Sequence, residues 1–271
     1  MKKYKTVLSI AGSDSGGGAG IQADLKTFSS LGCYGSTVVT ALTAQNTTGV
    51  QSVYEVPVAF VEKQIDAVLT DIGADAVKIG MLWSDELIES VAGIIKKYGL
   101  KNIVVDPVMS SQSGHSLVKD NIAAALMKHL LPLATVFTPN LPEAEKLLGY
   151  PVCKLRDMET AAQGFVDAGC DNVLIKGGHL DGGECVDVYL SSRSKELILF
   201  RGRRIDTVNN HGTGCTLSSA IAACLAKGDT PEKAVAKSKK YITNALNAGA
   251  DYSVGKGSGP VLHFFENASR F

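Results

Sequence analysis

The chain has 271 residues, 45% of them hydrophobic, and can bury a core as one large α/β domain or two small ones. Lys plus Arg and Asp plus Glu each number 27, so no basic field recruits nucleic acid and no acidic excess suggests a disordered tail. The six cysteines form no CxxC pair, and no segment reaches the ~20 apolar residues of a membrane span. We therefore expect free thiols in a cytoplasmic protein without nucleic-acid or membrane partners.

The first predicted unit is a strand, a glycine loop and a helix. Residues 7–11 form an apolar run, residues 12–20 are rich in glycine, and apolar residues at helical spacing follow from Ile21 to Leu31. The loop lacks both Gly-x-Gly-x-x-Gly and a Walker lysine, so it indicates a close backbone approach to a small ligand. Asp24 follows the loop by one helical turn and is either a ligand contact or a solvent-facing carboxylate.

Strands and helices then alternate along the chain. We expect strands at 34–45, 50–56, 76–80, 102–106, 135–137 and 172–176, and helices that include one after Pro57 and one capped by Ser84. Such alternation is typical of parallel strands joined by right-handed helical crossovers, with ligands beyond the carboxyl ends of the strands. The sequence therefore predicts one three-layer α/β/α domain, residues 1–271, around a mostly parallel sheet.

Polar side chains at the ends of these strands are candidates for chemistry. Asp106, Asn140 and Glu143 offer oxygen atoms, which magnesium prefers as ligands. Each has an ordinary alternative, because Asp before Pro is a common turn former and Glu143 could occupy the first turn of a helix over 142–148. Lys176 could meet nucleotide phosphates or be a solvated surface lysine.

The C-terminal third contains the stretch with the strongest chemical signal. Two antiparallel strands are expected at 185–190 and 196–200, and a helix from Thr230-Pro231 to about Ala248. Between them, residues 211–214 form a flexible entry to a buried helix whose first turn holds Cys215. A helix N-terminus binds anions readily, and phosphate is the obvious one. The alternative is that Cys215 is only a small buried apolar residue. The glycine-rich tail, 255–260, is expected to be flexible.

Six stretches together resemble the hydroxymethylpyrimidine and phosphomethylpyrimidine kinases of the ribokinase-like superfamily. They occur in the family's order, at residues 11–24, 41–46, 78–81, 106–109, 138–143 and 211–216. The resemblance implies a homodimeric kinase that phosphorylates 4-amino-5-hydroxymethyl-2-methylpyrimidine and then its monophosphate. It further implies that the kinase uses ATP and magnesium, and that it acts in thiamine biosynthesis.

The resemblance also implies roles for individual residues. The pyrimidine pocket would be lined by Gly12, Asp24, Gln45 and Met81. Asp106 and Glu143 would hold magnesium, with Asn140, Glu143 and Lys176 at the nucleotide phosphates. The catalytic stretch would be Gly212, Thr213, Gly214 and Cys215, where many ribokinase-like sugar kinases have Gly-Ala-Gly-Asp.

These implications lead to a mechanistic hypothesis for Cys215. An unperturbed thiol has a pKa near ~8.5, and we expect the helix N-terminus to lower it, so that a thiolate accepts the proton of the hydroxymethyl group. Backbone N–H groups from Gly212 to Cys215 would hold the charge on the transferred phosphoryl group.

Two other functions stay open at this point. One is a pyridoxal kinase of the same subfamily, because pyridoxal is also a nitrogen heterocycle with a hydroxymethyl group. The other is a nonenzymatic binding protein that uses the same crevice. Ser258 stands where the family tends to have a tail histidine, which leaves the tail's contribution to the pocket open, and a lid over 110–115 is a further possibility.

Overall fold

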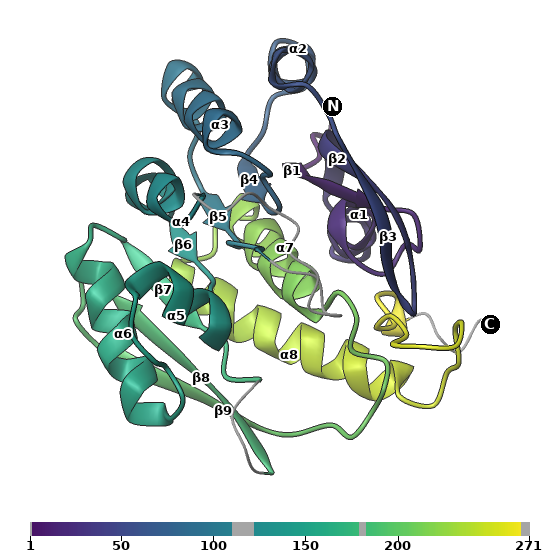
Figure 1. Cartoon of the computed structure of the whole chain (residues 1–271), viewed down its shortest axis with the longest axis vertical. Helices are drawn as coiled ribbons and strands as arrows, with labels where there is room; N and C mark the ends of the chain where they lie inside the picture. The colour runs from purple at the N-terminus through teal and green to yellow at the C-terminus, as the bar shows by residue number, and fades with distance from the viewer. Residues whose placement is uncertain (1, 110–121, 179–182, 267–271) are drawn as a thin grey trace.

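The computed structural model describes residues 2–109, 122–178 and 183–266, and in them one mixed sheet lies between two layers of helices (Figure 1). None of the helices described in these ranges is both long and apolar enough to cross a membrane. In the described residues the sheet has nine strands, in the order β3-β2-β1-β4-β5-β6-β7-β8-β9. They are β1 (Thr6–Asp14), β2 (Tyr34–Asn46), β3 (Gly49–Glu55), β4 (Ala76–Ile79), β5 (Ile103–Val105), β6 (Val136–Phe137), β7 (Asn172–Ile175), β8 (Glu184–Ser191) and β9 (Leu197–Arg203).

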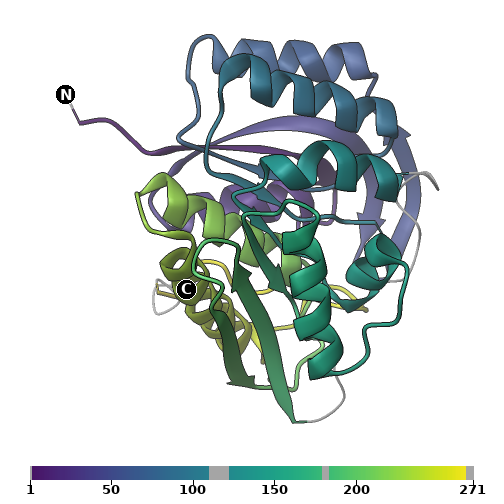
Figure 2. The same ribbon diagram turned by 90° about the vertical axis from the view of Figure 1, so that its left-hand side faces the viewer.

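The predicted mostly parallel sheet is confirmed. Strands β2, β1, β4, β5, β6 and β7 pair in parallel, whereas β3 at one edge and β8 and β9 at the other are antiparallel. Both views show the β8–β9 pair extending away from the parallel strands (Figure 1, Figure 2). The carboxyl ends of the parallel strands therefore meet at one edge of the sheet, where an α/β fold places its ligands.

Helices cover both faces because alternate strand residues point to opposite sides. The helices described are α1 (Gly20–Ser30), α2 (Val58–Leu69), α3 (Asp85–Tyr98), α4 (Ile122–Ala125), α5 (Leu141–Leu148), α6 (Leu155–Asp167), α7 (Thr213–Ala226) and α8 (Pro231–Gly249), with a short π-helix η1 (Leu126–Leu130) and a 3₁₀-helix η2 (Leu131–Leu133). Val105 packs with the core under α2, α3, α5 and α6, while Val104 packs with the core under α1, α7 and α8.

Local signals set several helix ends. Ser84 caps α3 as predicted, since its hydroxyl accepts the N–H of Leu87 at 3.1 Å. Gly99 ends the same helix with a φ of 59°, a left-handed conformation that favours glycine. Helix α6 was not predicted, and residues 110–115, where a lid was left open as a possibility, lie outside the described ranges.

Candidate active site

A cavity of about 1200 Å³ lies at the carboxyl ends of the parallel strands. It is lined by the glycine loop after β1, the ends of β2, β5 and β7, and the first turns of α5 and α7. One further lobe runs between β9 and α8, where Phe200 and Lys239 contribute. The structure brings together in this cavity all the predicted site residues except Asp24: Gly12, Gln45, Met81, Asp106, Asn140, Glu143, Lys176, Gly212, Thr213, Gly214 and Cys215.

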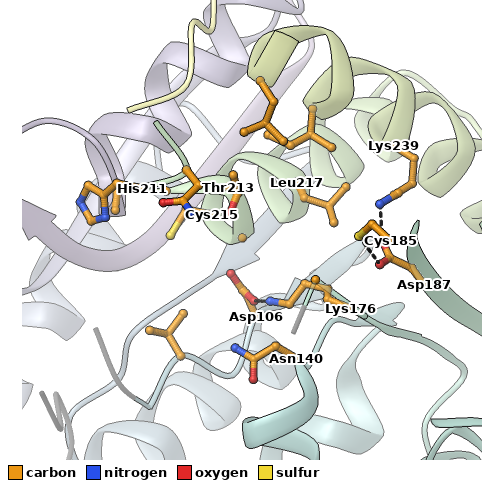
Figure 3. A pocket seen from close by; sticks show the side chains of 18 of the residues that line it. Asp106, Asn140, Lys176, Cys185, Asp187, His211, Thr213, Cys215, Leu217 and Lys239 are labelled. Carbon is orange, nitrogen blue, oxygen red and sulfur yellow. Dashed lines mark hydrogen bonds and ion pairs between the residues drawn. The ribbon is translucent and has the colours of Figure 1, made fainter. Parts of the chain in front are cut away.

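Lys176 is paired with two carboxylates of the cavity lining, and Figure 3 shows its contact with the first, Asp106. Its ammonium Nζ lies 2.6 Å from Asp106 Oδ1 and 3.8 Å from Glu143 Oε2. Burial alone would raise the pKa of Asp106, but the ammonium groups of Lys176 and Lys78 outweigh burial and hold it below its ordinary value. Burial would likewise lower the pKa of Lys176, yet Asp106 and Glu143 raise it, so the lysine is charged.

The start of α5 fixes the second carboxylate. Asn140 Oδ1 accepts the N–H of Glu143 at 2.9 Å, and Glu143 Oε2 accepts the N–H of Asn140 at 2.8 Å, which is a capping box. The alternative that Glu143 lies in the first turn of a helix is thus confirmed, and the same side chain also faces the cavity. Burial raises the pKa of Glu143 to about 7, with Lys176 lowering it and Asp106 raising it.

Helix α7 begins at the cavity in the way that its sequence predicts. Gly212 is the N-cap and has a φ of 78°, and a side chain on it would overlap the carbonyl oxygen of Gly18 in the glycine loop. Only glycine therefore lets the loop and the start of α7 touch. A Cβ atom on Gly214 would lie 3.4 Å from Lys176 Nζ, so the first turn of α7 also abuts the Lys176–Asp106 pair.

Cys215 faces the cavity from this first turn, but its predicted low pKa is wrong. Burial raises the pKa of the thiol to about 11; Lys78 lowers it, whereas Asp24 and Asp106 raise it. Stabilisation at a helix N-terminus is worth only ~0.3–1 kcal/mol at exposed positions, too little to offset desolvation and two nearby carboxylates. In the ligand-free protein the thiol is therefore protonated at neutral pH.

The prediction that Asp24 lines the pyrimidine pocket is also wrong, as is the alternative that it faces solvent. Its side chain is 0% exposed, and its Oδ1 lies 2.9 Å from Lys78 Nζ. Ser9 and Ser219 each donate a hydroxyl to the carboxylate at 2.6 Å. Buried charges need such partners, and Lys78 stands 54 residues further along the chain. Lys78 itself reaches the cavity lining.

Asp14 is a site residue that sequence reasoning missed, and its partner is His211, the first residue of the predicted entry to α7. The carboxylate of Asp14 accepts the N–H groups of Gly16, Gly18 and Ala19 at 2.8–3.0 Å and lies 2.9 Å from His211 Nε2. Burial would raise the pKa of Asp14, but the His211 and backbone hydrogen bonds lower it. Asp14 thus fixes the glycine loop and ties it to the residue that precedes Gly212. Both residues lie inside the six stretches that carry the family resemblance, at 11–24 and 211–216, and this was the available signal.

The glycine-rich tail, residues 255–260, was expected to be flexible, but it forms hydrogen bonds with other segments. Ser258 donates its N–H to the carbonyl of Thr47 at 2.9 Å, and the Thr47 hydroxyl accepts the N–H groups of Lys256 and Gly257. The N–H of His211 bonds the carbonyl of Gly259 at 3.0 Å. The tail is therefore outside the cavity lining, but it holds two segments next to the cavity, the β2–β3 turn and the entry to α7.

The sequence is similar to those of known kinases over nearly its whole length. The sequence model of the family described as phosphomethylpyrimidine kinase matches residues 14–262. A hydroxymethylpyrimidine/phosphomethylpyrimidine kinase of Rhizobium meliloti is 49% identical over 95% of this chain and 96% of its own length. A thiamine biosynthesis bifunctional protein of Geobacter sulfurreducens is 48% identical over 95% of this chain, which spans only 52% of that protein.

Solved structures show the same relationship. A Bacillus subtilis pyridoxal kinase in complex with ADP superposes with a TM-score of 0.89 at 38% identity, covering 99% of both chains. A phosphomethylpyrimidine kinase of Clostridium difficile superposes with a TM-score of 0.78 at 47% identity, covering 89% of this chain and 99% of that one. The expected ribokinase-like α/β fold is thereby confirmed.

Proposed function

Because the chain belongs to the phosphomethylpyrimidine kinase family, we propose that it transfers the γ-phosphoryl group of ATP to 4-amino-5-hydroxymethyl-2-methylpyrimidine and then to its monophosphate, in thiamine biosynthesis. One observation carries the proposal. A single cavity joins a glycine loop and Gln45, suited to a small heterocycle, with the first turn of α7 and the Lys176–Asp106 pair, suited to phosphates. Phosphoryl transfer needs mainly such positioning and electrostatic stabilisation.

The acceptor ring is proposed to bind between the glycine loop and the ends of β2 and β4. Gly12, Gln45 and Met81 line this part, and a Cβ atom on Gly12 would lie 3.1 Å from Met81 Sδ, so glycine keeps the space open. The amide of Gln45 can both donate to and accept from the edge of an aminopyrimidine. Its Oε1 accepts the hydroxyl of Thr43 at 3.2 Å, which fixes the amide in the cavity.

The phosphates are proposed to bind across the cavity, at Lys176 and the backbone N–H groups of residues 212–215. Asn140 would help to order the nucleotide phosphates, and the lobe between β9 and α8 has room for the rest of the nucleotide. Support for ATP comes from a pyridoxal kinase of Staphylococcus aureus in complex with AMP-PCP and pyridoxal, which superposes with a TM-score of 0.89 at 36% identity.

Magnesium would be held by Asp106 and Glu143. No three His, Cys, Asp or Glu side chains gather into a metal cluster in the part of the chain that the structure describes. Magnesium fits nevertheless, because it is usually bound by one or two carboxylates together with substrate phosphates and waters. Bound there, the ion would neutralise charge on the phosphates. Chelation with EDTA should abolish turnover, and added magnesium should restore it.

Cys215 is proposed to accept the proton of the hydroxymethyl group as its oxygen attacks phosphorus. General-base catalysis is typically worth ~10²–10⁴-fold, so Cys215→Ala should lower turnover of the alcohol by that order while ATP binding persists. Because the thiol has a pKa of about 11, the thiolate fraction and hence the rate should also rise with pH between 7 and 10. Turnover that is unchanged in Cys215→Ala would rule out the role.

The proposed activity is tested by supplying ATP and magnesium with the pyrimidine alcohol and counting the phosphates added. The second candidate, a pyridoxal kinase, is favoured by structures such as the Bacillus subtilis enzyme, so pyridoxal is assayed in parallel. We expect a higher kcat/KM for the pyrimidine and two phosphates on it. A higher kcat/KM for pyridoxal would make vitamin B6 salvage the function, and no ATP consumption with either would contradict both.

The proposal also includes a cellular location, the cytoplasm, and an oligomeric state, the homodimer. All six cysteines are free, which supports action in the reducing cytoplasm. The homodimer stays a prediction that sedimentation of the purified protein would check.

A further inference from the structure

Lys176 follows directly on β7, at the point where the strand pairing on one of its sides stops. Towards β6, the backbone of Lys176 pairs with that of Asn140, and the N–H of Lys176 bonds the carbonyl of Pro139 at 2.8 Å. Towards β8, the regular pairing ends with Ile175 opposite Val188, one residue before the lysine. Because a backbone N–H needs an acceptor, the peptide after Lys176 requires another partner on this side.

Asp187 of β8 supplies this partner with its side chain. Its Oδ1 accepts the N–H of Gly177, the residue after Lys176, at 2.9 Å. A Cβ atom on Gly177 would overlap the carbonyl oxygen of Val186, so only glycine lets the chain lie this close to β8. The backbone around Lys176 is therefore held by Pro139 on one side and by Asp187 on the other.

The carboxylate of Asp187 is buried, and its counter-ion comes from the helical layer. Its side chain is 2% exposed, and Lys239 of α8 places its Nζ 2.6 Å from Oδ2, as Figure 3 shows. The thiol of Cys185 lies 4.0 Å from Oδ1, so protein groups engage both carboxylate oxygens. A buried carboxylate needs such partners, and a charged acceptor holds an N–H roughly twice as strongly as a neutral one. Asp187 thus ties Gly177 to α8 as well as to β8.

We propose that Asp187 is a positioning residue for Lys176: through the N–H of Gly177 it sets where the Lys176 ammonium stands in the cavity. The inference rests on the proposed function, in which Lys176 binds the phosphates of ATP. The ammonium is 2.6 Å from Asp106 Oδ1, so a shift of the neighbouring peptide is passed on to a tightly fitted contact. A misplacement of about 1 Å in a reacting site costs ~10²-fold in rate.

The test compares two variants of the full chain that differ only in the acceptor at position 187. Both carry Lys239→Met, so that neither leaves the Lys239 ammonium unpaired. Asp187→Asn keeps an oxygen for the N–H of Gly177, and Asp187→Leu has the same branched shape without one. We expect kcat/KM for ATP to be ~10–10²-fold lower with Leu than with Asn, while KM for the pyrimidine alcohol differs by about threefold at most. Steady-state kinetics with ATP, magnesium and the alcohol measure both.

A second comparison asks whether Asp187 acts through Lys176. Lys176→Met is added to both variants, which removes the group that Asp187 is proposed to position. The difference in kcat/KM for ATP between Asn and Leu at position 187 should then shrink to about threefold or less, because two residues that act in one chain of contacts are not additive. A general structural role of Asp187 would leave the difference unchanged.

Equal kcat/KM for ATP in the Asn and Leu variants would overturn the inference, and so would a difference that persists without Lys176. If the Leu variant does not fold, Asp187→Ala in the same background takes its place, and failure of both to fold would show that Asp187 supports the fold as a whole. If the variants with Lys176→Met do not fold, the contrast between ATP and the alcohol decides. A wild-type protein that phosphorylates no acceptor would remove the proposed function itself, and the Asn and Leu variants are then compared by their Kd for ATP in titration calorimetry.

Discussion

Lys176 combines a strong positive charge with a fixed position. It ends up beside Asp106 because its backbone N–H bonds the carbonyl of Pro139 at 2.8 Å, which aligns the end of β7 with the start of α5. A lysine that is held in this way would contribute its charge to the proposed phosphate site without further ordering.

Replacing Lys176 by Met should lower activity, and it should also lower stability because the buried carboxylate of Asp106 loses its partner. Loss of one such donor typically lowers kcat ~10²–10³-fold, and we expect kcat/KM for ATP to fall by at least ~10²-fold. Steady-state kinetics check this, with Lys237→Met as the control, because Lys237 forms an exposed ion pair with Asp229 that is worth only ~0–1 kcal/mol. Activity of Lys176→Met within tenfold of wild type would contradict the role.

Residue types and their spacing indicated the cavity well, but they did not indicate burial. Asp24 one turn after a glycine loop looks the same whether it meets a ligand or a buried lysine, and Lys78 comes from another strand. The prediction of a low pKa for Cys215 failed for the same reason. Folding buries the thiol and brings the carboxylates of Asp24 and Asp106 close to it, and both effects raise its pKa. Local sequence reports neither.

At the scale of elements, the start of α7 is held closely against the glycine loop. Gly212→Ala should place a methyl group against the carbonyl of Gly18 and force a left-handed conformation that costs ~1–2 kcal/mol by itself. We expect a larger loss in the free energy of unfolding than this strain alone and a large drop in kcat.

Gly99→Ala is the control for Gly212→Ala. It has a similar φ of 59° but nothing within 4 Å of an added Cβ, so only the strain remains. Urea denaturation compares the two variants. Equal losses of stability would show that the contact between the glycine loop and α7 is unimportant.

His263 anchors the other side of α7 and makes stability depend on pH. Its Nε2 lies 3.0 Å from Thr216 Oγ1, and burial lowers the pKa of the imidazole to about 4. The unfolded chain binds the proton near pH ~6.5, so stability is complete above that pH and is lost as pH falls towards 4.

Between pH 7.5 and 5 the loss of stability from His263 should be about 2 kcal/mol, at 1.36 kcal/mol per pKa unit. His263→Gln should remove most of this difference, and denaturation curves at the two pH values measure it. A variant with the same pH dependence as wild type would show that other groups cause the loss.

Strands and capped helices were predictable because their signals are local. The apolar runs became β1, β4, β5 and β7 with only small changes at their ends, and Ser84 caps α3. Helix α6 has a clear buried face, with Met158, Ala161 and Phe165, but four of its residues at other positions are charged and no side-chain cap from a Ser, Thr, Asp or Asn precedes it. The face of the sheet that each helix covers depends on how the chain connects one strand to the next, and a local sequence pattern does not specify this connection.

At the scale of the whole molecule, the buried Asp24–Lys78 pair joins the sheet to one helical layer. Its partners come from four elements: Ser9 of β1, Asp24 of α1, Lys78 of β4 and Ser219 of α7. Removing one partner of a buried pair leaves an uncompensated charge and is typically destabilising by ~3–5 kcal/mol.

A double-mutant cycle tests the importance of the pair. Asp24→Asn and Lys78→Met should each lower the free energy of unfolding by ~3–5 kcal/mol, and the double variant should lose much less than the sum of the two. Urea denaturation of the three variants gives the interaction free energy. Additive losses would show that the two charges do not stabilise the fold as a pair.

The contact between Asp14 and His211 also affects the order in which the protein folds. The two residues are 197 positions apart, and the tail carbonyl that holds the backbone of His211 lies further still along the chain. During synthesis the glycine loop is made early, and its partner His211 is added only after most of the remaining chain has been made. Contacts of such long range are slow to form. Recovery of ligand binding in a refolding protein should therefore trail recovery of helical circular dichroism, which makes the cavity a natural reporter of the last step of folding.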